Sequence, residues 1–451
     1  MSEKRNSFTG KLGFVLAAAG SAVGLGNIWR FPYLAAEYGG AIFLLVYIAL
    51  AVTFGSTLLV AEIAIGRKTG LSAIGAYKKL DKRFSFIGWI GAIVPMIILP
   101  YYSVIGGWVL KYFSGYVSGA SSEMANGSYF GSYISGTAEP LILFGAFLAI
   151  TSVAVILGVE KGVEKVSKFM MPMLVVFMLF LSFYTIFALD GAWEGVVYYL
   201  KPDFSKFSIM TVVAAMGQLF YSMSLAMGIM ITFGSYMKKD ISIEKSARNI
   251  EIFDTGIAFL AGLMIIPAVF AFSNGGDNIP NGPGLMFIAL PKVFDSMSGG
   301  FIIGALFFLM VFFAAVTSSI SLMETVVSIV CDKLGWKRLP ACFAVIGASV
   351  VLGSLSVLGY SVWSDFTILK FRILDFFDFI SNNVIMPIGA LLTCIFIAYF
   401  LKPKTIIDEL EIGGEFKAKG LFNVMIKYVA PVMLVVILVS SVLNAFGVIT
   451  I

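Results

Sequence analysis

The stretch Gly20-Ser-Ala-Val-Gly-Leu-Gly-Asn-Ile-Trp-Arg-Phe-Pro32 interrupts the first strongly apolar segment of the chain. Its three glycines each weaken a helix interior by roughly 1 kcal/mol relative to Ala, and Pro32 lacks the N–H that a helix would use. In lipid, unwound backbone is tolerated only where it is buried in protein or lines a cavity. We therefore predict a helix broken at membrane depth, with free peptide groups facing something polar. Gly20 and Gly24 alone would also fit a helix-packing face, but Asn27 and Arg30 favour the break.

The composition is that of a protein that crosses a membrane many times. Of its 451 residues, 59% are hydrophobic and 13% charged, and the mean hydropathy is +0.96, whereas soluble domains carry about 25% charged residues. The absence of histidine excludes imidazole metal sites and histidine proton relays. No Gly-Lys-Ser/Thr phosphate loop for ATP is present. We expect a lipid bilayer as the surroundings, no covalent catalysis and no nucleic-acid partner.

Eleven apolar stretches are long enough to cross a bilayer, which takes roughly 20 residues per helix. They lie at about 11–35, 41–66, 87–115, 141–157, 169–188, 209–236, 249–272, 300–330, 340–358, 373–400 and 427–448. An odd number of spans places the termini on opposite sides of the membrane. Most of the 31 Lys and Arg residues fall on the side of the N-terminus, so the positive-inside rule predicts a cytoplasmic N-terminus and an outside C-terminus.

Three long segments then lie outside, at 116–140, 189–208 and 273–299. The last begins with the turn-rich run 273–284, which would either cap a vestibule or form a plain surface loop.

A second apolar segment carries its own interruption, Gln218-Leu-Phe-Tyr-Ser-Met-Ser-Leu-Ala-Met-Gly228, in the sixth span. It follows the first interrupted span by five spans, an odd offset that gives two halves of opposite topology. Paired interrupted segments in corresponding positions of two halves point to the binding site of a secondary transporter. We predict one transmembrane domain over 1–451, with repeat one at about 11–188, repeat two at about 209–400 and an extra helix at about 427–448.

Hydroxyl groups gather in the eighth span, at Thr317, Ser318, Ser319 and Ser321. Residues three and four apart share a helix face, and hydroxyl and carbonyl oxygens suit a hard cation such as sodium. The alternative is that these side chains bond back to their own helix backbone, as Ser and Thr commonly do.

These motifs together resemble the neurotransmitter:sodium symporter family. The stretch Gly20–Tyr33 is similar to the first-helix signature of the family. Gly217-Gln-Leu-Phe-Tyr-Ser-Met-Ser-Leu, Ala314-Ala-Val-Thr-Ser-Ser and Asp375-Phe-Phe-Asp378 resemble its sixth-, eighth- and tenth-helix motifs, in order along the chain. The resemblance implies an all-α polytopic membrane protein of the leucine-transporter fold, with a five-plus-five inverted repeat, discontinuous helices 1 and 6 and an eleventh helix. Members are sodium-coupled carriers of amino acids and amines.

The resemblance implies two sodium sites. Backbone carbonyls would supply part of the second site and hydroxyls the rest, from Gly20, Val23, Ala314, Thr317 and Ser318. The first site would use the Ala22 carbonyl, the Asn27 amide oxygen, Ser222 and Asp254, with the substrate carboxylate as the remaining ligand. Half-helix N-termini favour that carboxylate, and unwound carbonyls hold the cation.

Asp254 is the ligand with the loosest match to the family pattern. Aligning the seventh span by Gly262 places Asp254 at the ligand position, whereas aligning it by Pro267 places Phe253 there. The alternative reading pairs the Asp254 carboxylate with Lys245 or Arg248 near the cytoplasmic mouth. An acid at the ion site supplies a fixed negative charge, so the resemblance predicts chloride independence, because members without that charge recruit chloride.

The substrate pocket that the resemblance implies combines backbone groups, two tyrosines and an apolar wall. Tyr102 would donate its phenol to the substrate carboxylate, and Tyr221 would cover the substrate as a lid. The predicted substrate-binding residues are Ser21, Ala22, Gly24, Leu25, Gly26, Ile98, Tyr102, Tyr221, Ser222, Ser224, Met227, Ser318 and Leu322. Alone, Met227 and Leu322 also fit ordinary packing. Amine carriers of the family have an acid at the position of Gly24, so its absence favours an α-amino acid, and the apolar lining favours a large neutral one.

Two gates are implied by the same resemblance. Arg30 and Asp378 would form the outer ion pair with Gln218 bridging them, although each charge could instead reach the outer interface separately. At the inner side, Arg5 and Asp332 would pair near Tyr236 and Ser235, or remain solvated at helix ends. Glu62 is expected to accept hydrogen bonds from unwound backbone of the sixth span.

We therefore predict a sodium-coupled importer of a neutral L-amino acid in the bacterial inner (plasma) membrane. An ion channel would show rings of charge or repeated filter loops, which the sequence lacks. A transport-inactive receptor or scaffold of the same fold, and a proton-coupled carrier using Glu62 and Asp254, remain alternatives. The sequence does not give the particular amino acid, the ion stoichiometry or the oligomeric state.

Overall fold

Uninterrupted apolar runs form long helices in this computed structural model, which describes residues 7–273 and 282–448. Lipid cannot bond to free peptide groups, so a segment that crosses it satisfies them within a helix. In the described part, nine helices are long and apolar enough to cross a membrane. They are built from α3 (Ala41–Leu50), η2 (Ala51–Gly55) and α4 (Ser56–Thr69); η3 (Lys82–Phe84) and α6 (Ser85–Ser118); α9 (Ala138–Ile156); η4 (Val159–Glu164) and α10 (Lys165–Ala188); α14 (Ile243–Ser273); α16 (Gly300–Leu334); α17 (Arg338–Leu358); α18 (Ile373–Asp378), η7 (Phe379–Ile385), α19 (Met386–Ile395) and η8 (Phe396–Leu401); and α21 (Lys419–Val424), η9 (Met425–Val429) and α22 (Ala430–Ala445).

The other two predicted spans are the interrupted ones. The first consists of α1 (Lys11–Ala22) and the pair η1 (Gly26–Arg30) and α2 (Phe31–Glu37), bent by 55° at the break. The sixth consists of α12 (Ile209–Ser222) and α13 (Ile229–Ser235), of 14 and 7 residues, so neither crosses a membrane alone. All eleven predicted spans therefore correspond to a helix or a helix pair.

Several helices extend further than the hydropathy of the sequence predicts. The fifth span begins at Val159 rather than near 169, and the seventh begins at Ile243 rather than near 249. These extra turns carry charged residues such as Glu164 and Arg248, which lower the mean hydropathy without ending the helix.

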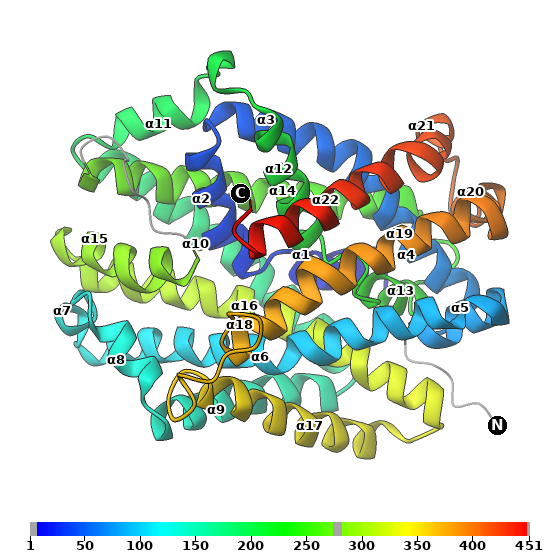
Figure 1. The fold of residues 1–451 in the computed structure, drawn as a ribbon, viewed down its shortest axis with the longest axis horizontal. Coiled ribbons are helices and arrows are strands. Elements are labelled where there is room, and N and C mark those ends of the chain that lie inside the picture. The colour runs from blue at the N-terminus through cyan, green and yellow to red at the C-terminus, as the bar shows by residue number, and fades with distance from the viewer. Residues whose placement is uncertain (1–6, 274–281, 449–451) are drawn as a thin grey trace.

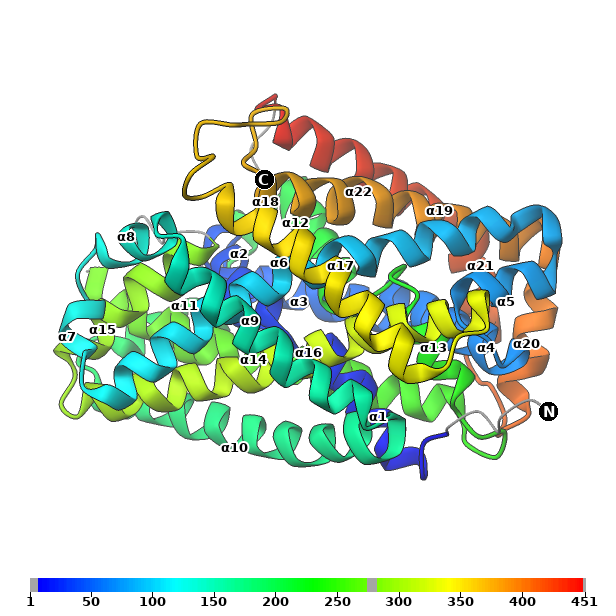
Figure 2. The ribbon, with the colours of Figure 1, turned by 90° about the horizontal axis from the view of Figure 1, so that it is seen from below.

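Several short helices lie at the two ends of the molecule (Figures 1 and 2). At one end, called the outer end here, lie α7 (Ser121–Met124), α8 (Tyr129–Ser135), α11 (Ala192–Leu200), η6 (Leu285–Ala289) and α15 (Leu290–Ser296). At the opposite inner end lie α5 (Ala73–Leu80) and α20 (Pro403–Glu411). The three long segments predicted outside thus contribute their helices to one end, although residues 274–281 of the turn-rich run lie outside the described residues.

The interrupted first span runs through the centre of the bundle. Every residue of α1 from Gly13 to Ala22 is buried, and α1 packs against α14, α16 and α10. Gly20 permits close approach to α16, because a Cβ there would lie 3.1 Å from the Thr317 Cβ. The break therefore lies in protein rather than in lipid, as unwound backbone requires.

Candidate ion and substrate site

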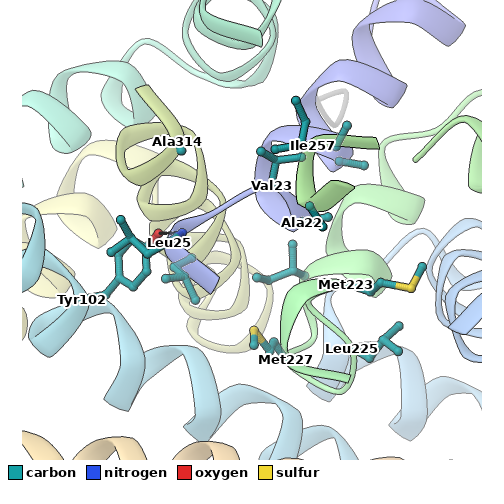
Figure 3. Close-up of a cluster of buried hydrophobic side chains, with 14 of the residues drawn as sticks. Ala22, Val23, Leu25, Tyr102, Met223, Leu225, Met227, Ile257 and Ala314 are labelled. Carbon is teal, nitrogen blue, oxygen red and sulfur yellow. Dashed lines mark hydrogen bonds between the residues drawn. The ribbon is translucent and has the colours of Figure 1, made fainter. Parts of the chain in front are cut away.

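The two interrupted spans face each other at their breaks. Helix α1 ends at Ala22, and Val23 is extended with φ −75° and ψ 101°. The second break contains Ser224 and Ala226, which have φ 54° and 58°, followed by Gly228. The Ser224 Oγ donates to the Ser21 carbonyl oxygen at 3.0 Å. Figure 3 shows Ala22 and Val23 on one segment and Met223, Leu225 and Met227 on the other.

A cavity lies between the two breaks. All thirteen of the substrate-binding residues predicted from the sequence line it, together with Asn27 and Ile229: they are Ser21, Ala22, Gly24, Leu25, Gly26, Ile98, Tyr102, Tyr221, Ser222, Ser224, Met227, Ser318 and Leu322. The structure therefore brings this predicted set together. The lining contains backbone, hydroxyl, amide and apolar groups but no charged side chain.

Two glycines are needed where the cavity meets neighbouring side chains. A Cβ on Gly24 would lie 2.9 Å from the Ser318 Oγ and 3.2 Å from the Tyr102 hydroxyl. A Cβ on Gly26 would lie 2.7 Å from the Tyr221 ring. Tyr102 also accepts a long hydrogen bond of 3.5 Å from the Leu25 N–H, drawn in Figure 3. A polar end of the cavity thus combines a phenol with unwound backbone.

Asp254 is fully buried beside this cavity. Its carboxylate accepts hydrogen bonds from the Asn27 Nδ2 at 2.8 Å, the Tyr47 hydroxyl at 3.0 Å and the Ser222 Oγ at 3.1 Å. Among the described residues, no Lys or Arg forms an ion pair with Asp254 within 4.0 Å. The structure therefore places Asp254 with Asn27 and Ser222, as the alignment by Gly262 predicts, and not with Lys245 or Arg248.

Tyr47 is the member of this cluster that sequence reasoning missed. It is fully buried in α3 and contacts both Ser222, at 2.9 Å, and Asp254. A phenol in the otherwise apolar helix α3 was the available signal, because a buried Tyr hydroxyl usually has a polar partner.

A second cluster of oxygens lies where the break meets α16. The Ser318 Oγ is 3.2 Å from each of the carbonyl oxygens of Gly20, Ser21 and Val23. The Thr317 Oγ1 donates to the Phe313 and Ala314 carbonyl oxygens at 3.0 and 3.1 Å. The five residues predicted for the second sodium site are thus neighbours, and neutral oxygens of this kind suit a hard cation.

The outer gate differs from the prediction. Arg30 and Asp378 both line a vestibule, and Tyr221 lines both this vestibule and the cavity. Among the ion pairs within 4.0 Å in the described chain, none joins them; Asp378 accepts from the Tyr101 hydroxyl at 3.0 Å and from the Asn382 Nδ2 at 2.7 Å. The two charges face the same vestibule without direct contact.

Arg30 and Gln218 instead contact two residues that line the cavity, Tyr221 and Gly26. The Arg30 guanidinium lies 5.6 Å from the Tyr221 ring centroid. The Gln218 Nε2 donates to the Gly26 carbonyl oxygen at 3.0 Å, so it holds the first break and does not bridge the predicted gate pair.

The inner gate is placed only in part, because Arg5 lies outside the described residues. Asp332 accepts a hydrogen bond from the Ser72 N–H at 2.7 Å. Tyr236 donates to the Glu324 Oε1 at 2.8 Å, and Glu324 forms an ion pair with Arg338. This pair, in which Glu324 is buried and Arg338 partly exposed, could not be predicted from the sequence, since neither residue stands in a motif.

Glu62 accepts a hydrogen bond from the Ala226 N–H at 2.7 Å, as predicted. Ala226 has the left-handed backbone conformation that L side chains rarely adopt. The bond satisfies a peptide group that the break frees, so Glu62 stabilises the interrupted segment.

Two interrupted helices that meet at a buried, oxygen-lined cavity define a secondary transporter. The sequence profile of the Sodium:neurotransmitter symporter family matches residues 5–123 and 135–448, and the chain belongs to this family. It is therefore a multi-pass, sodium-dependent membrane transporter and not an enzyme.

Relatives with similar sequences cover almost the whole chain. The "Uncharacterized sodium-dependent transporter YhdH" of Bacillus subtilis (strain 168) is 35% identical, with 100% of both chains aligned. An "Uncharacterized sodium-dependent transporter" of Haemophilus influenzae is 30% identical over 97% of this chain and 98% of its own. Both names agree with the assignment to a sodium-dependent family.

A solved structure confirms the predicted fold class. The crystal structure of MhsT in complex with L-phenylalanine matches with a TM-score of 0.87 at 35% identity, covering 97% of this chain and 100% of that chain. The chain thus has the leucine-transporter fold, with discontinuous helices 1 and 6.

Proposed function

We propose that this protein is a sodium-coupled symporter that imports a large neutral L-amino acid by alternating access. The observation that carries the proposal is the cavity between the two breaks, which shares Ala22, Asn27 and Ser222 with the predicted first ion site. An amino acid there would place its carboxylate beside the cation, which couples the two directly.

The chemistry of the lining supports an apolar or aromatic α-amino acid. Ile98, Met227, Ile229 and Leu322 form an apolar wall, and Met adapts to different side-chain shapes. Position 24 is a glycine, so no acidic side chain is present there to pair with the amino group of a substrate that lacks a carboxylate. The similar MhsT was crystallised in complex with L-phenylalanine, and a side chain of that size is our first candidate here.

Two sodium ions are proposed as co-substrates. One would bind at the Asp254 cluster with the Ala22 carbonyl, the Asn27 amide and Ser222, and the other at the cluster of Gly20, Val23, Ala314, Thr317 and Ser318. Asp254 supplies a fixed negative charge at the first cluster, so transport is proposed to be chloride-independent.

The direction of transport follows from the proposed orientation. The Lys and Arg bias of the sequence supports a cytoplasmic N-terminus in a bacterial inner membrane, with the vestibule opening to the outside. Outside sodium would stabilise the outward-facing state, and substrate would close Tyr221 over the cavity before the inner side opens.

The decisive experiment is uptake of labelled amino acids into proteoliposomes with sodium, potassium or choline outside. We expect accumulation of large neutral amino acids with sodium only, unchanged when gluconate replaces chloride. Saturable binding without accumulation would instead favour a transport-inactive receptor. Accumulation driven by a pH gradient without sodium would favour a proton-coupled carrier that uses Glu62 and Asp254.

Removing one predicted ligand from each sodium site tests the ion assignment. Asn27→Ala and Thr317→Ala should each weaken sodium binding and reduce uptake, because each removes an oxygen ligand. Sodium affinity is measured from the sodium dependence of substrate binding. Unchanged sodium affinity in both variants would show that the sites are misassigned.

A further inference from the structure

A fully buried arginine joins three segments at the inner end of the molecule. Arg67 lies in the last turn of α4, and its side chain has 0% exposure. Its Nε donates to the Glu409 Oε1 of α20 at 2.8 Å, and a second guanidinium nitrogen donates to the Ile241 carbonyl oxygen at 2.6 Å. The third nitrogen donates to the Glu409 carbonyl oxygen. Because a buried charge is costly unless it is paired and hydrogen-bonded, Arg67 holds these segments together only while all these contacts persist.

Helices α4 and α13 form one unit through their backbones, and α13 ends shortly before the Ile241 segment that Arg67 contacts. A Cβ on Gly66 would overlap the Ile231 carbonyl oxygen of α13, and a Cβ on Gly234 would overlap the Ile63 carbonyl oxygen of α4. Such close contact prevents α13, the inner half of the second interrupted span, from sliding along α4. Arg67 follows Gly66 directly in the sequence, so it extends this unit towards α20.

Helix α20 packs on this unit and is joined to its sequence neighbours by unusual backbone. Its buried residues include Ile406, Glu409 and Leu410, and α4 is its main neighbour. Lys402, which precedes α20, has φ 69°, and Gly414, which follows it, has φ 139°. These two residues end the helical path on either side of α20, which they separate from the tenth span and from α21. Small backbone rotations can be absorbed at both residues.

We propose that Arg67 and Glu409 are positioning residues that fix α20 to the α4–α13 unit, so that α20 moves with the inner half of the second interrupted span when the inner end opens. Lys402 is the hinge at which α20 turns relative to the tenth span. This inference rests on the proposed alternating-access cycle, whose own test is uptake.

Distances between spin labels test whether α20 moves with α4. Three exposed lysines are suitable positions: Lys68 at the end of α4, Lys404 on α20 and Lys337 at the start of α17. Each is changed to Cys in a chain whose native Cys331, Cys342 and Cys394 are replaced by Ala. The pairs 68–404 and 337–404 are compared with sodium and L-phenylalanine and without sodium in potassium.

We expect the 337–404 distance to differ between the two conditions while the 68–404 distance stays constant. The proposal is overturned if the 68–404 distance changes as much as the 337–404 distance, or if the 337–404 distance does not change. Sodium-driven uptake by the same labelled protein separates a failure of this inference from a failure of the proposed function.

A matched pair of substitutions on α20 tests the ion pair itself. Glu409→Gln removes the carboxylate that pairs with buried Arg67 and with the half-exposed Lys239. Glu411→Gln removes the partner of Lys419, in a pair whose side chains are 36% and 47% exposed. We expect Glu409→Gln to broaden the 68–404 distance distribution and to lower the maximal uptake rate about tenfold, given the cost of an unpaired buried charge. Glu411→Gln should change neither. A narrow, wild-type distribution in Glu409→Gln would overturn the proposal.

Discussion

At the scale of single residues, the placement of charge decides the chemistry of the site. Asp254 is fully buried and receives three side-chain hydrogen bonds, from Asn27, Tyr47 and Ser222. Three donors lower the cost of burying a carboxylate but do not neutralise it. A cation at this cluster would compensate the negative charge of the Asp254 carboxylate, which is the physical reason for proposing the first sodium ion there.

Replacing Asp254 with Asn tests the source of the negative charge. The amide keeps the shape but removes the charge, so we expect uptake to fall at least tenfold in gluconate, which corresponds to a loss of about 1.4 kcal/mol, and to recover in part when chloride is added. Uptake is measured in both anions, with the wild-type protein as control. Uptake at the wild-type level by Asp254→Asn in gluconate would contradict the proposed role.

Replacing Gly24 with Ala tests the space at the polar end of the cavity. The new Cβ would meet the Ser318 Oγ at 2.9 Å and the Tyr102 hydroxyl at 3.2 Å, so substrate affinity should fall by about tenfold or more, since cores tolerate little overpacking. Gly145→Ala on α9, where nothing lies within 4 Å of the new atom, is the matched control. Substrate affinity is measured by equilibrium binding, and equal affinity in both variants would argue against this geometry.

At the scale of elements, each interrupted helix is held by side chains from elsewhere. Gln218 bonds to the Gly26 carbonyl oxygen in the first break, and Glu62 bonds to the Ala226 N–H in the second. Both side chains satisfy peptide groups that a continuous helix would have paired internally. The breaks are therefore stabilised by tertiary contacts rather than by local sequence alone.

Two substitutions of Glu62 distinguish loss of the hydrogen-bond acceptor for the Ala226 N–H from loss of the carboxylate charge. Glu62→Ala should lower the stability of the folded protein by roughly 1–3 kcal/mol, because it leaves the Ala226 N–H buried without a partner. Glu62→Gln keeps an oxygen acceptor and should cost less. Thermal unfolding in detergent measures both, and the same unfolding temperature for wild type and Glu62→Ala would refute the role of the bond.

At the scale of the whole molecule, a vestibule lies on one side of the site, and buried side-chain bonds join helices on the other side. The vestibule reaches Tyr221 from the outer end, and Arg30 lies over the Tyr221 ring without an ion pair to Asp378 within 4.0 Å. At the inner end, Tyr236 bonds to Glu324, and Arg67 bonds to Glu409. This asymmetry is what an outward-facing state of an alternating-access transporter requires.

The proposed ion coupling predicts a dependence on membrane potential. A neutral amino acid that moves with two sodium ions carries net positive charge inward, and each charge gains about 2.3 kcal/mol per 100 mV. An inside-negative potential, set with valinomycin and a potassium gradient, should therefore increase the initial rate of sodium-driven uptake. An initial uptake rate that does not change with the membrane potential would exclude a net movement of charge with the substrate.

The sequence by itself determined the elements and the two breaks, because apolar length and the backbone chemistry of Gly and Pro are local properties. The thirteen cavity residues were predicted through the resemblance to the symporter family, position by position, and not from hydropathy or spacing. Only the tertiary structure decided which distant side chains meet: Tyr47 with Asp254, Glu324 with Arg338, Arg67 with Glu409, and Arg30 with Tyr221 rather than with Asp378. These pairings depend on how helices far apart in the chain pack, and hydropathy and spacing within one helix do not encode that.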